Sequence, residues 1–124
     1  MDFQQNRSIT TLHNLGLRSL EQKEVELQLF SGYRPMELVL PCLYSEIDGP
    51  ALEPIVEHLS SIKYISHITI GLDKATKAEF EDAKRFFKRL QSPHSVIWND
   101  GPRLTQLRQS LENVGLEMGE QGKG

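Results

Sequence analysis

The chain has 124 residues, of which 38% are hydrophobic and 25% are charged, and its formal net charge at pH 7 is -3. A chain of this length buries one core and little more, and its small negative charge gives no bulk attraction to nucleic acid or to anionic lipid. The single cysteine excludes an internal disulfide and any zinc site built on several cysteines.

The sequence contains no apolar run of the roughly 20 residues that a membrane-spanning helix needs, and its beginning lacks the apolar core of a signal peptide. We therefore expect a cytoplasmic protein with neither nucleic acid nor a membrane as its partner.

The first part of the chain has a helical pattern. Hydrophobic residues recur at helical spacing over residues 9–20. Those of residues 25–29 alternate as in a strand, but they lie among Glu, Gln and Lys, which favour helix. Pro35 disfavours helical backbone in the residue before it. We therefore predict a helical lead-in over residues 1–34.

The rest of the chain, residues 35–124, repeats a strand followed by a helix. The predicted strands are 36–40, 65–72 and 95–99. The helices begin after turn or cap signals at Asp48-Gly49-Pro50, Thr76-Lys77-Ala78-Glu79 and Asp100-Gly101-Pro102, and Gly115 is expected to end the last one. This order predicts an α/β fold with a three-layer, Rossmann-like parallel sheet flanked by helices.

Ligands of open parallel sheets bind at the carboxyl ends of the strands. We therefore expect the loops 41–49, 72–76 and 99–103 to lie along one edge, with 119–124 as a further candidate segment. Three common motifs are absent from the sequence. Two bind phosphate, namely a Gly-x-Gly-x-x-Gly loop after the first strand and a P-loop ending in Gly-Lys-Ser/Thr, and the third is the Gly-x-Ser-x-Gly nucleophile elbow of hydrolases.

Two motifs resemble a known family. The apolar run that enters Leu40-Pro41-x-Leu43-x-x-Glu46, and the later Gly122-Lys123-Gly124, resemble the N-terminal, nucleotide-binding half of a GT-A-fold glycosyltransferase over residues 36–124. The most similar group is the one that includes glucosyl-3-phosphoglycerate synthase. Its first-strand motif reads Leu-Pro-Ala-Leu-Asn-Glu-Glu, from which Cys42, Tyr44 and Ser45 depart.

The resemblance implies a nucleotide-binding function. The loop from Pro41 through Leu43 would pack around the nucleoside, with Glu46 holding polar groups of the nucleotide. Lys123 would neighbour the nucleotide, and Asp73 corresponds best to the polar residue after the second strand of the family. The implied activity is transfer of a sugar from a UDP- or GDP-sugar donor to a small acceptor.

The resemblance also implies a divalent metal, Mg or Mn, in the complete enzyme. The family holds this metal with an Asp-x-Asp motif, which the sequence lacks. We therefore expect this chain to bind no metal and to be inactive alone. We interpret it as an incomplete GT-A half-domain, namely a truncated chain, a proteolysed remnant or a split gene product.

Several residues have alternative roles. Asp73 would otherwise cap a helix or pair with Lys74, Asp100 would be a helix N-cap, and Arg103 would be a solvated side chain rather than a phosphate ligand. Trp98 is expected in the core or at its edge. The alternative functions are a non-catalytic α/β regulatory or assembly module and a nucleotidyltransferase, and an exposed sheet edge would allow homo-oligomers.

Overall fold

A computed structural model describes residues 19–117 and residue 119. The chain divides into two compact units, residues 1–35 and 36–124. In the first unit, helix α2 (Leu20–Tyr33) begins at a capping box, in which the Ser19 hydroxyl accepts from the Gln22 backbone and the Gln22 side chain accepts from the Ser19 backbone. The helical lead-in is thus confirmed for residues 20–33, and the earlier part of this prediction lies outside the described residues.

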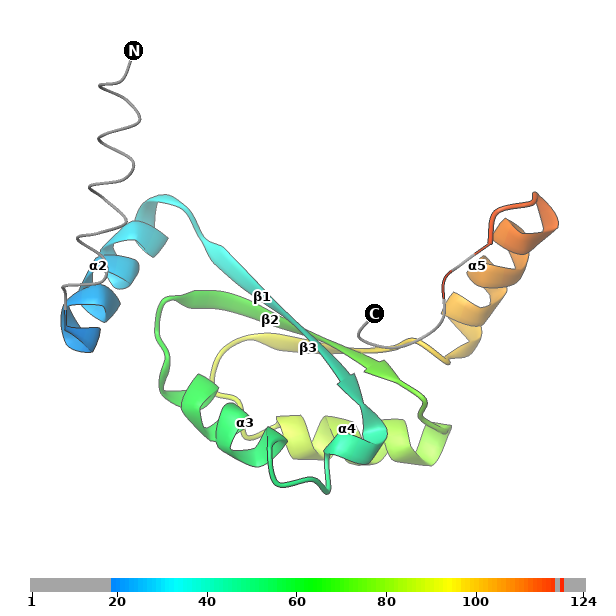
Figure 1. Ribbon diagram of the computed structural model, residues 1–124, viewed down its shortest axis with the longest axis horizontal. Coiled ribbons are helices and arrows are strands. Elements are labelled where there is room, and N and C mark those ends of the chain that lie inside the picture. Colours follow the sequence, from blue (N-terminus) through cyan, green and yellow to red (C-terminus); the bar gives the residue numbers. More distant parts are fainter. Residues whose placement is uncertain (1–18, 118, 120–124) are drawn as a thin grey trace, which may run out of the picture. The chain divides into compact units, whose positions relative to one another are not determined.

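The second unit is built of strands and helices in alternation (Figure 1). Its elements are β1 (Met36–Leu43), the 3-10 turn η1 (Tyr44–Glu46), α3 (Leu52–Ser61), β2 (Ile65–Asp73), α4 (Lys77–Phe87), β3 (His94–Trp98) and α5 (Pro102–Asn113). The strands form a parallel sheet in the order β1-β2-β3. The predicted α/β fold with a parallel sheet and flanking helices is confirmed.

Helices α3 and α4 cover the same face of the sheet (Figure 1). Right-handed crossovers between successive neighbouring strands place both helices on one side. Among the described residues, the core between these helices and the sheet contains 11 buried hydrophobic residues, namely Cys42, Leu52, Val56, Leu59, Ile68, Ile70, Leu72, Ala75, Ala83, Phe87 and Leu90. The alternation of strand side chains therefore divides the sheet into a core face and an opposite face.

The opposite face carries exposed apolar side chains: Val39 is 69% exposed and Ile97 is 43% exposed. Helix α5 contains no buried residue, and Leu107 on its apolar stripe is exposed. The stripe expected on the last helix is therefore present but is not buried by the part of the chain that the structure describes. The helix ends as predicted, because Gly115 adopts a left-handed backbone with φ of 81°.

The first strand is longer than its apolar run indicated. The prediction ended it at Leu40 and placed Pro41 and Leu43 in a loop, but both lie within β1 and pair with Gly71 and Asp73 of β2. Among the described residues β1 is an edge strand, so the missing N–H of Pro41 removes no hydrogen bond from the sheet interior. The loop prediction for Pro41 and Leu43 was wrong for this reason.

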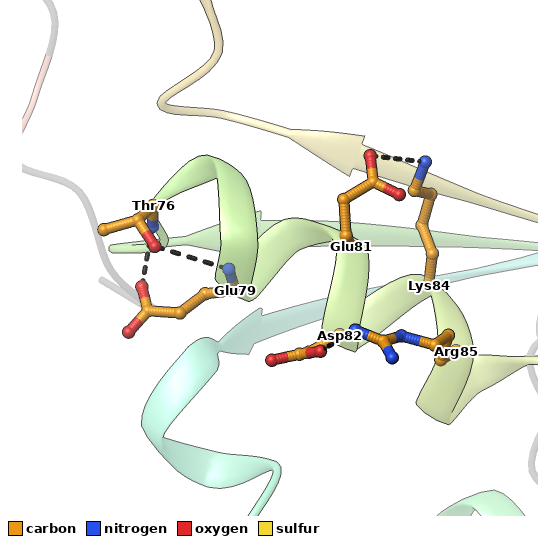
Figure 2. Close-up of polar contacts among 6 residues, drawn as sticks. All are labelled: Thr76, Glu79, Glu81, Asp82, Lys84 and Arg85. Carbon is orange, nitrogen blue, oxygen red and sulfur yellow. Dashed lines mark hydrogen bonds and ion pairs between the residues drawn. The ribbon is translucent and has the colours of Figure 1, made fainter.

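Helix α4 begins at the predicted capping box (Figure 2). The Thr76 hydroxyl accepts from the Glu79 backbone at 3.3 Å, and the Glu79 carboxylate accepts from the Thr76 backbone at 2.6 Å. Further along the exposed side, Lys84 pairs with Glu81, and an equivalent ion pair joins Arg85 to Asp82. Because these pairs are exposed, the cap is the stronger determinant of where the helix begins.

Candidate functional site

The three strands end side by side at the carboxyl edge of the sheet. In the register of the sheet, Leu43 lies opposite Asp73, and Leu72 lies opposite Trp98. The backbone of Asn99 continues this pairing, because its N–H donates to the Leu72 carbonyl at 3.0 Å. The segments that follow β1, β2 and β3 therefore start next to one another, as expected for a ligand-binding edge of a parallel sheet.

Three predicted site residues lie on the same face of the sheet at this edge. Cys42 faces the core and is 1% exposed, so its neighbours Pro41 and Leu43 lie on the opposite face. Asp73 shares that face, because it follows the core residue Leu72 and pairs with Leu43. Pro41, Leu43 and Asp73 thus form one continuous surface.

Glu46 has a structural role at the end of β1. Its carboxylate accepts a hydrogen bond from the Leu43 N–H at 2.9 Å, which fixes the start of η1. The turn then closes through the Gly49 N–H, which donates to the Glu46 carbonyl at 3.0 Å. A side chain at Gly49 would place its Cβ 3.1 Å from that carbonyl oxygen, so glycine suits this close approach. Glu46 is therefore held beside Leu43, at the edge where the resemblance placed it.

Asp73 is buried at the end of β2, where it is 8% exposed. Its Oδ1 accepts a hydrogen bond from Asn99 Nδ2 at 2.8 Å. Neither alternative role predicted for Asp73 is found: the cap of α4 is Thr76, and the observed partner of Asp73 is Asn99 rather than Lys74.

The loop after Asp73 is fixed at Ala75, whose backbone N–H and carbonyl are both hydrogen-bonded to side chains at the end of β3. The Ala75 N–H donates to Asp100 Oδ2 at 3.0 Å, and the Ala75 carbonyl accepts from the Trp98 indole N–H at 2.8 Å. Trp98 also stacks on Phe80 of α4, with ring centroids 5.3 Å apart. Lys74 takes the left-handed backbone, with φ of 52°, that lets the chain turn here. The N-cap prediction for Asp100 was wrong, because Gly101 caps α5 and the Asp100 carboxylate is bonded to Ala75.

The edge next to β1 is acidic. Partial burial raises the pKa of the Tyr44 phenol above its ordinary value of 10.0, and the nearby carboxylates of Asp82, Asp48 and Glu79 raise this pKa further. The same charges disfavour any anion at Tyr44. A phosphate group at this edge is therefore expected away from Tyr44.

Arg103 lies in the first turn of α5 and lines a hollow beside β3. The hollow has a volume of about 640 Å³ and is mainly apolar. The remaining residues that line it are Ile97, Leu104, Gln106, Leu107 and Ser110. Lys123, the remaining predicted nucleotide ligand, lies outside the described residues, so its place relative to Glu46 and Asp73 stays a prediction.

The described side chains contain no cluster of metal ligands. Within residues 19–117 and 119, no three side chains of His, Cys, Asp or Glu come together in a way that would hold one. Three carboxylates at this edge already accept hydrogen bonds: Glu46 from Leu43, Asp73 from Asn99 and Asp100 from Ala75. No helix in the same part of the chain is long and apolar enough to cross a membrane.

Two known proteins are similar in sequence to this chain along nearly all of its length. A glucosyl-3-phosphoglycerate synthase of Persephonella marina is 46% identical over 123 residues, which is 99% of this chain. A second glucosyl-3-phosphoglycerate synthase, of Methanococcoides burtonii, is 34% identical over 125 residues and matches the whole chain. The chain is a homologue of part of these two synthases.

The comparison confirms the resemblance inferred from the motifs at residues 40–46. The chain spans about 30% of the length of each of these relatives. No family model matches the chain, and no solved structure matches it.

One edge residue was missed by the sequence reasoning. Asn99 was placed in an edge loop without a role, although it is bonded to the buried Asp73. The only signal in the sequence is that Asn99 comes at the end of a predicted strand, as Asp73 does. The side-chain contact itself depends on strand pairing, which the sequence does not specify.

Proposed function

We propose that this chain is the donor-binding part of a glycosyltransferase that uses a nucleotide-activated sugar, a UDP- or GDP-sugar. In the complete enzyme the sugar passes to a small acceptor, and the names of the relatives point to a glucosyl donor and a phosphoglycerate acceptor. The observation that carries the proposal is the similarity to these synthases along the whole chain. The convergence of Leu43, Glu46 and Asp73 at one edge of the sheet supports it.

Each residue of this edge has a chemistry that suits part of the donor. Pro41 and Leu43 offer an apolar surface on which the nucleoside base packs. The carboxylates of Glu46 and Asp73 accept hydrogen bonds from hydroxyl or N–H groups of the nucleoside. Lys123 supplies a positive charge for the diphosphate. Lys123 would thus contact the diphosphate of the donor, and the other four residues would contact its nucleoside.

The leaving nucleoside diphosphate develops negative charge, which a divalent cation neutralises. We propose that Mg or Mn serves the complete enzyme and is held by carboxylates that lie outside this chain, since its sequence contains no Asp-x-Asp. The chain alone then binds the donor without transferring the sugar. We infer a cytoplasmic enzyme from these substrates. The outer strands β1 and β3 could pair with a second copy of the chain and form a homo-oligomer.

The proposal is tested by calorimetry of the chain with UDP and with GDP. We expect binding of one of them and a weaker affinity in Glu46→Ala. Glu57→Ala is the matched control, because Glu57 is an exposed carboxylate on α3 that lines a different hollow, together with Ser92 and Pro93. An unchanged affinity of Glu46→Ala removes that residue from the site. No heat with either nucleotide at millimolar concentration contradicts the proposal and favours a non-catalytic module.

A further inference from the structure

The buried pair of Asp73 and Asn99 joins the ends of two neighbouring strands. Asp73 ends β2 and Asn99 follows β3, and their side chains meet at 2.8 Å. Both lie on the face of the sheet that α3 and α4 do not cover, since Trp98 and Leu72 belong to the core side. The pair therefore lies on the same surface as Leu43.

The position of Asn99 is fixed from two sides. Its backbone N–H donates to the Leu72 carbonyl, and because Leu72 pairs with Trp98, Asn99 lies opposite Asp73. A side chain at Gly71 would place its Cβ 3.5 Å from Asn99 Nδ2, an ordinary van der Waals contact, so the amide lies beside the Cα of Gly71 on that face. The amide nitrogen thus has a defined place from which to donate.

The carboxylate of Asp73 is oriented by this amide. A carboxylate has two oxygens and accepts several hydrogen bonds. Asn99 takes Oδ1, and among the described residues no donor is found for the other oxygen. The bond turns that second oxygen to a fixed direction at the carboxyl edge of the sheet, where ligands of parallel sheets bind.

We propose that Asn99 is a positioning residue, which fixes the Asp73 carboxylate so that its second oxygen accepts a hydrogen bond from the nucleoside part of the donor. This inference rests on the proposed function. Asn99 acts through Asp73 and does not itself contact the nucleotide. Preorganised hydrogen-bond partners increase affinity because the ligand does not have to order them on binding.

A double-mutant cycle on nucleotide affinity tests this role. We compare the chain with Asn99→Leu, Asp73→Asn and the double variant, using calorimetry with UDP and GDP. Each single change is expected to weaken binding by about tenfold, the effect typical of losing one hydrogen bond to a charged group. If Asn99 acts through Asp73, then Asn99→Leu causes no further loss in the Asp73→Asn background.

A second variant separates positioning from folding. In Asn99→Asp a second carboxylate faces that of Asp73. Because the two negative charges repel each other, the pair keeps one shared proton to a higher pH than an isolated carboxylate would. The shared proton restores a donor at low pH, so we expect binding by this variant to approach that of the unchanged chain near pH 5 and to weaken as the pH rises. A merely structural role would change thermal stability without producing this pH profile.

The outcomes distinguish the two proposals. If the unchanged chain binds a nucleotide and Asn99→Leu binds equally well, or if the two single effects add independently, the role of Asn99 is overturned while the proposed function stands. If the unchanged chain binds neither nucleotide, the proposed function fails and the role of Asn99 fails with it. Coupled losses together with the pH profile of Asn99→Asp support the inference.

Discussion

Trp98 offers the sharpest test of how the edge of the sheet is held. Its indole N–H donates to the Ala75 carbonyl at 2.8 Å, and its ring stacks on Phe80. Trp98→Phe keeps an aromatic ring for the stack but removes the hydrogen bond. Since Ala75 is 7% exposed, its carbonyl then lacks both its partner and ready access to water.

The magnitude follows from these contacts. A buried polar group left without its partner costs about 1–3 kcal/mol. The smaller ring also leaves a void beside Phe80, which adds a fraction of the roughly 1 kcal/mol that an aromatic pair contributes. We therefore expect Trp98→Phe to lower the free energy of unfolding by about 2 kcal/mol, a large share of the roughly 5–15 kcal/mol of a typical domain.

Urea denaturation followed by far-UV circular dichroism measures this loss, with an unchanged slope showing that the unfolded state is not altered. Phe30→Leu is the control, because Phe30 is an exposed aromatic residue on α2 and its change is expected to stay within about 0.5 kcal/mol. A loss for Trp98→Phe that is no larger than the control would refute the role of the indole N–H in holding the Ala75 loop.

Three further predictions concern single positions in the second unit. Thr76→Ala removes the side-chain partner of the Glu79 N–H and should lower the unfolding free energy by about 1 kcal/mol; Thr76→Ser, which keeps the hydroxyl, should restore most of it in the same urea titration. Phe87→Ala opens a cavity at a side chain that is 0% exposed and should cost about 3–5 kcal/mol, so a loss below about 1 kcal/mol would show that this core is loosely packed. The raised pKa of Tyr44 predicts a contribution to stability that is complete below pH 10 and is lost as the pH rises through the pKa in the folded chain. Asp82→Asn should lower the pH at which the Tyr44 phenol titrates, measured by ultraviolet absorbance as the difference from Tyr44→Phe. An unchanged titration would exclude Asp82 as a cause of the raised pKa.

The fold was predictable because its signals are local. Hydrophobic runs separated by turn and cap signals placed all three strands and the helices between them, and the Thr76 box fixed where α4 begins. The end of β1 was not predictable in this way. Proline normally interrupts a strand, and it is tolerated at Pro41 because β1 lies at an edge of the described sheet, which is a property of the tertiary arrangement.

The site could be predicted to the level of loops but not of contacts. Strand order alone brings Leu43, Glu46 and Asp73 to one edge. The bonds from Asn99 to Asp73 and from Asp100 to Ala75 join residues about 25 positions apart and depend on the register of β2 against β3. A cap assignment for Asp100 was reasonable from the sequence, because Asp before Gly-Pro is a common helix start.

We expect a nucleoside diphosphate to bind at the carboxyl edge of this sheet. The most direct measurement is the change in backbone amide NMR signals of the labelled chain when UDP or GDP is added. One nucleotide is expected to shift the signals of residues 43–46, 73–76 and 99–103 together. Shifts confined to the opposite edge, at residues 62–65 and 91–94, or no shift with either nucleotide, would contradict it.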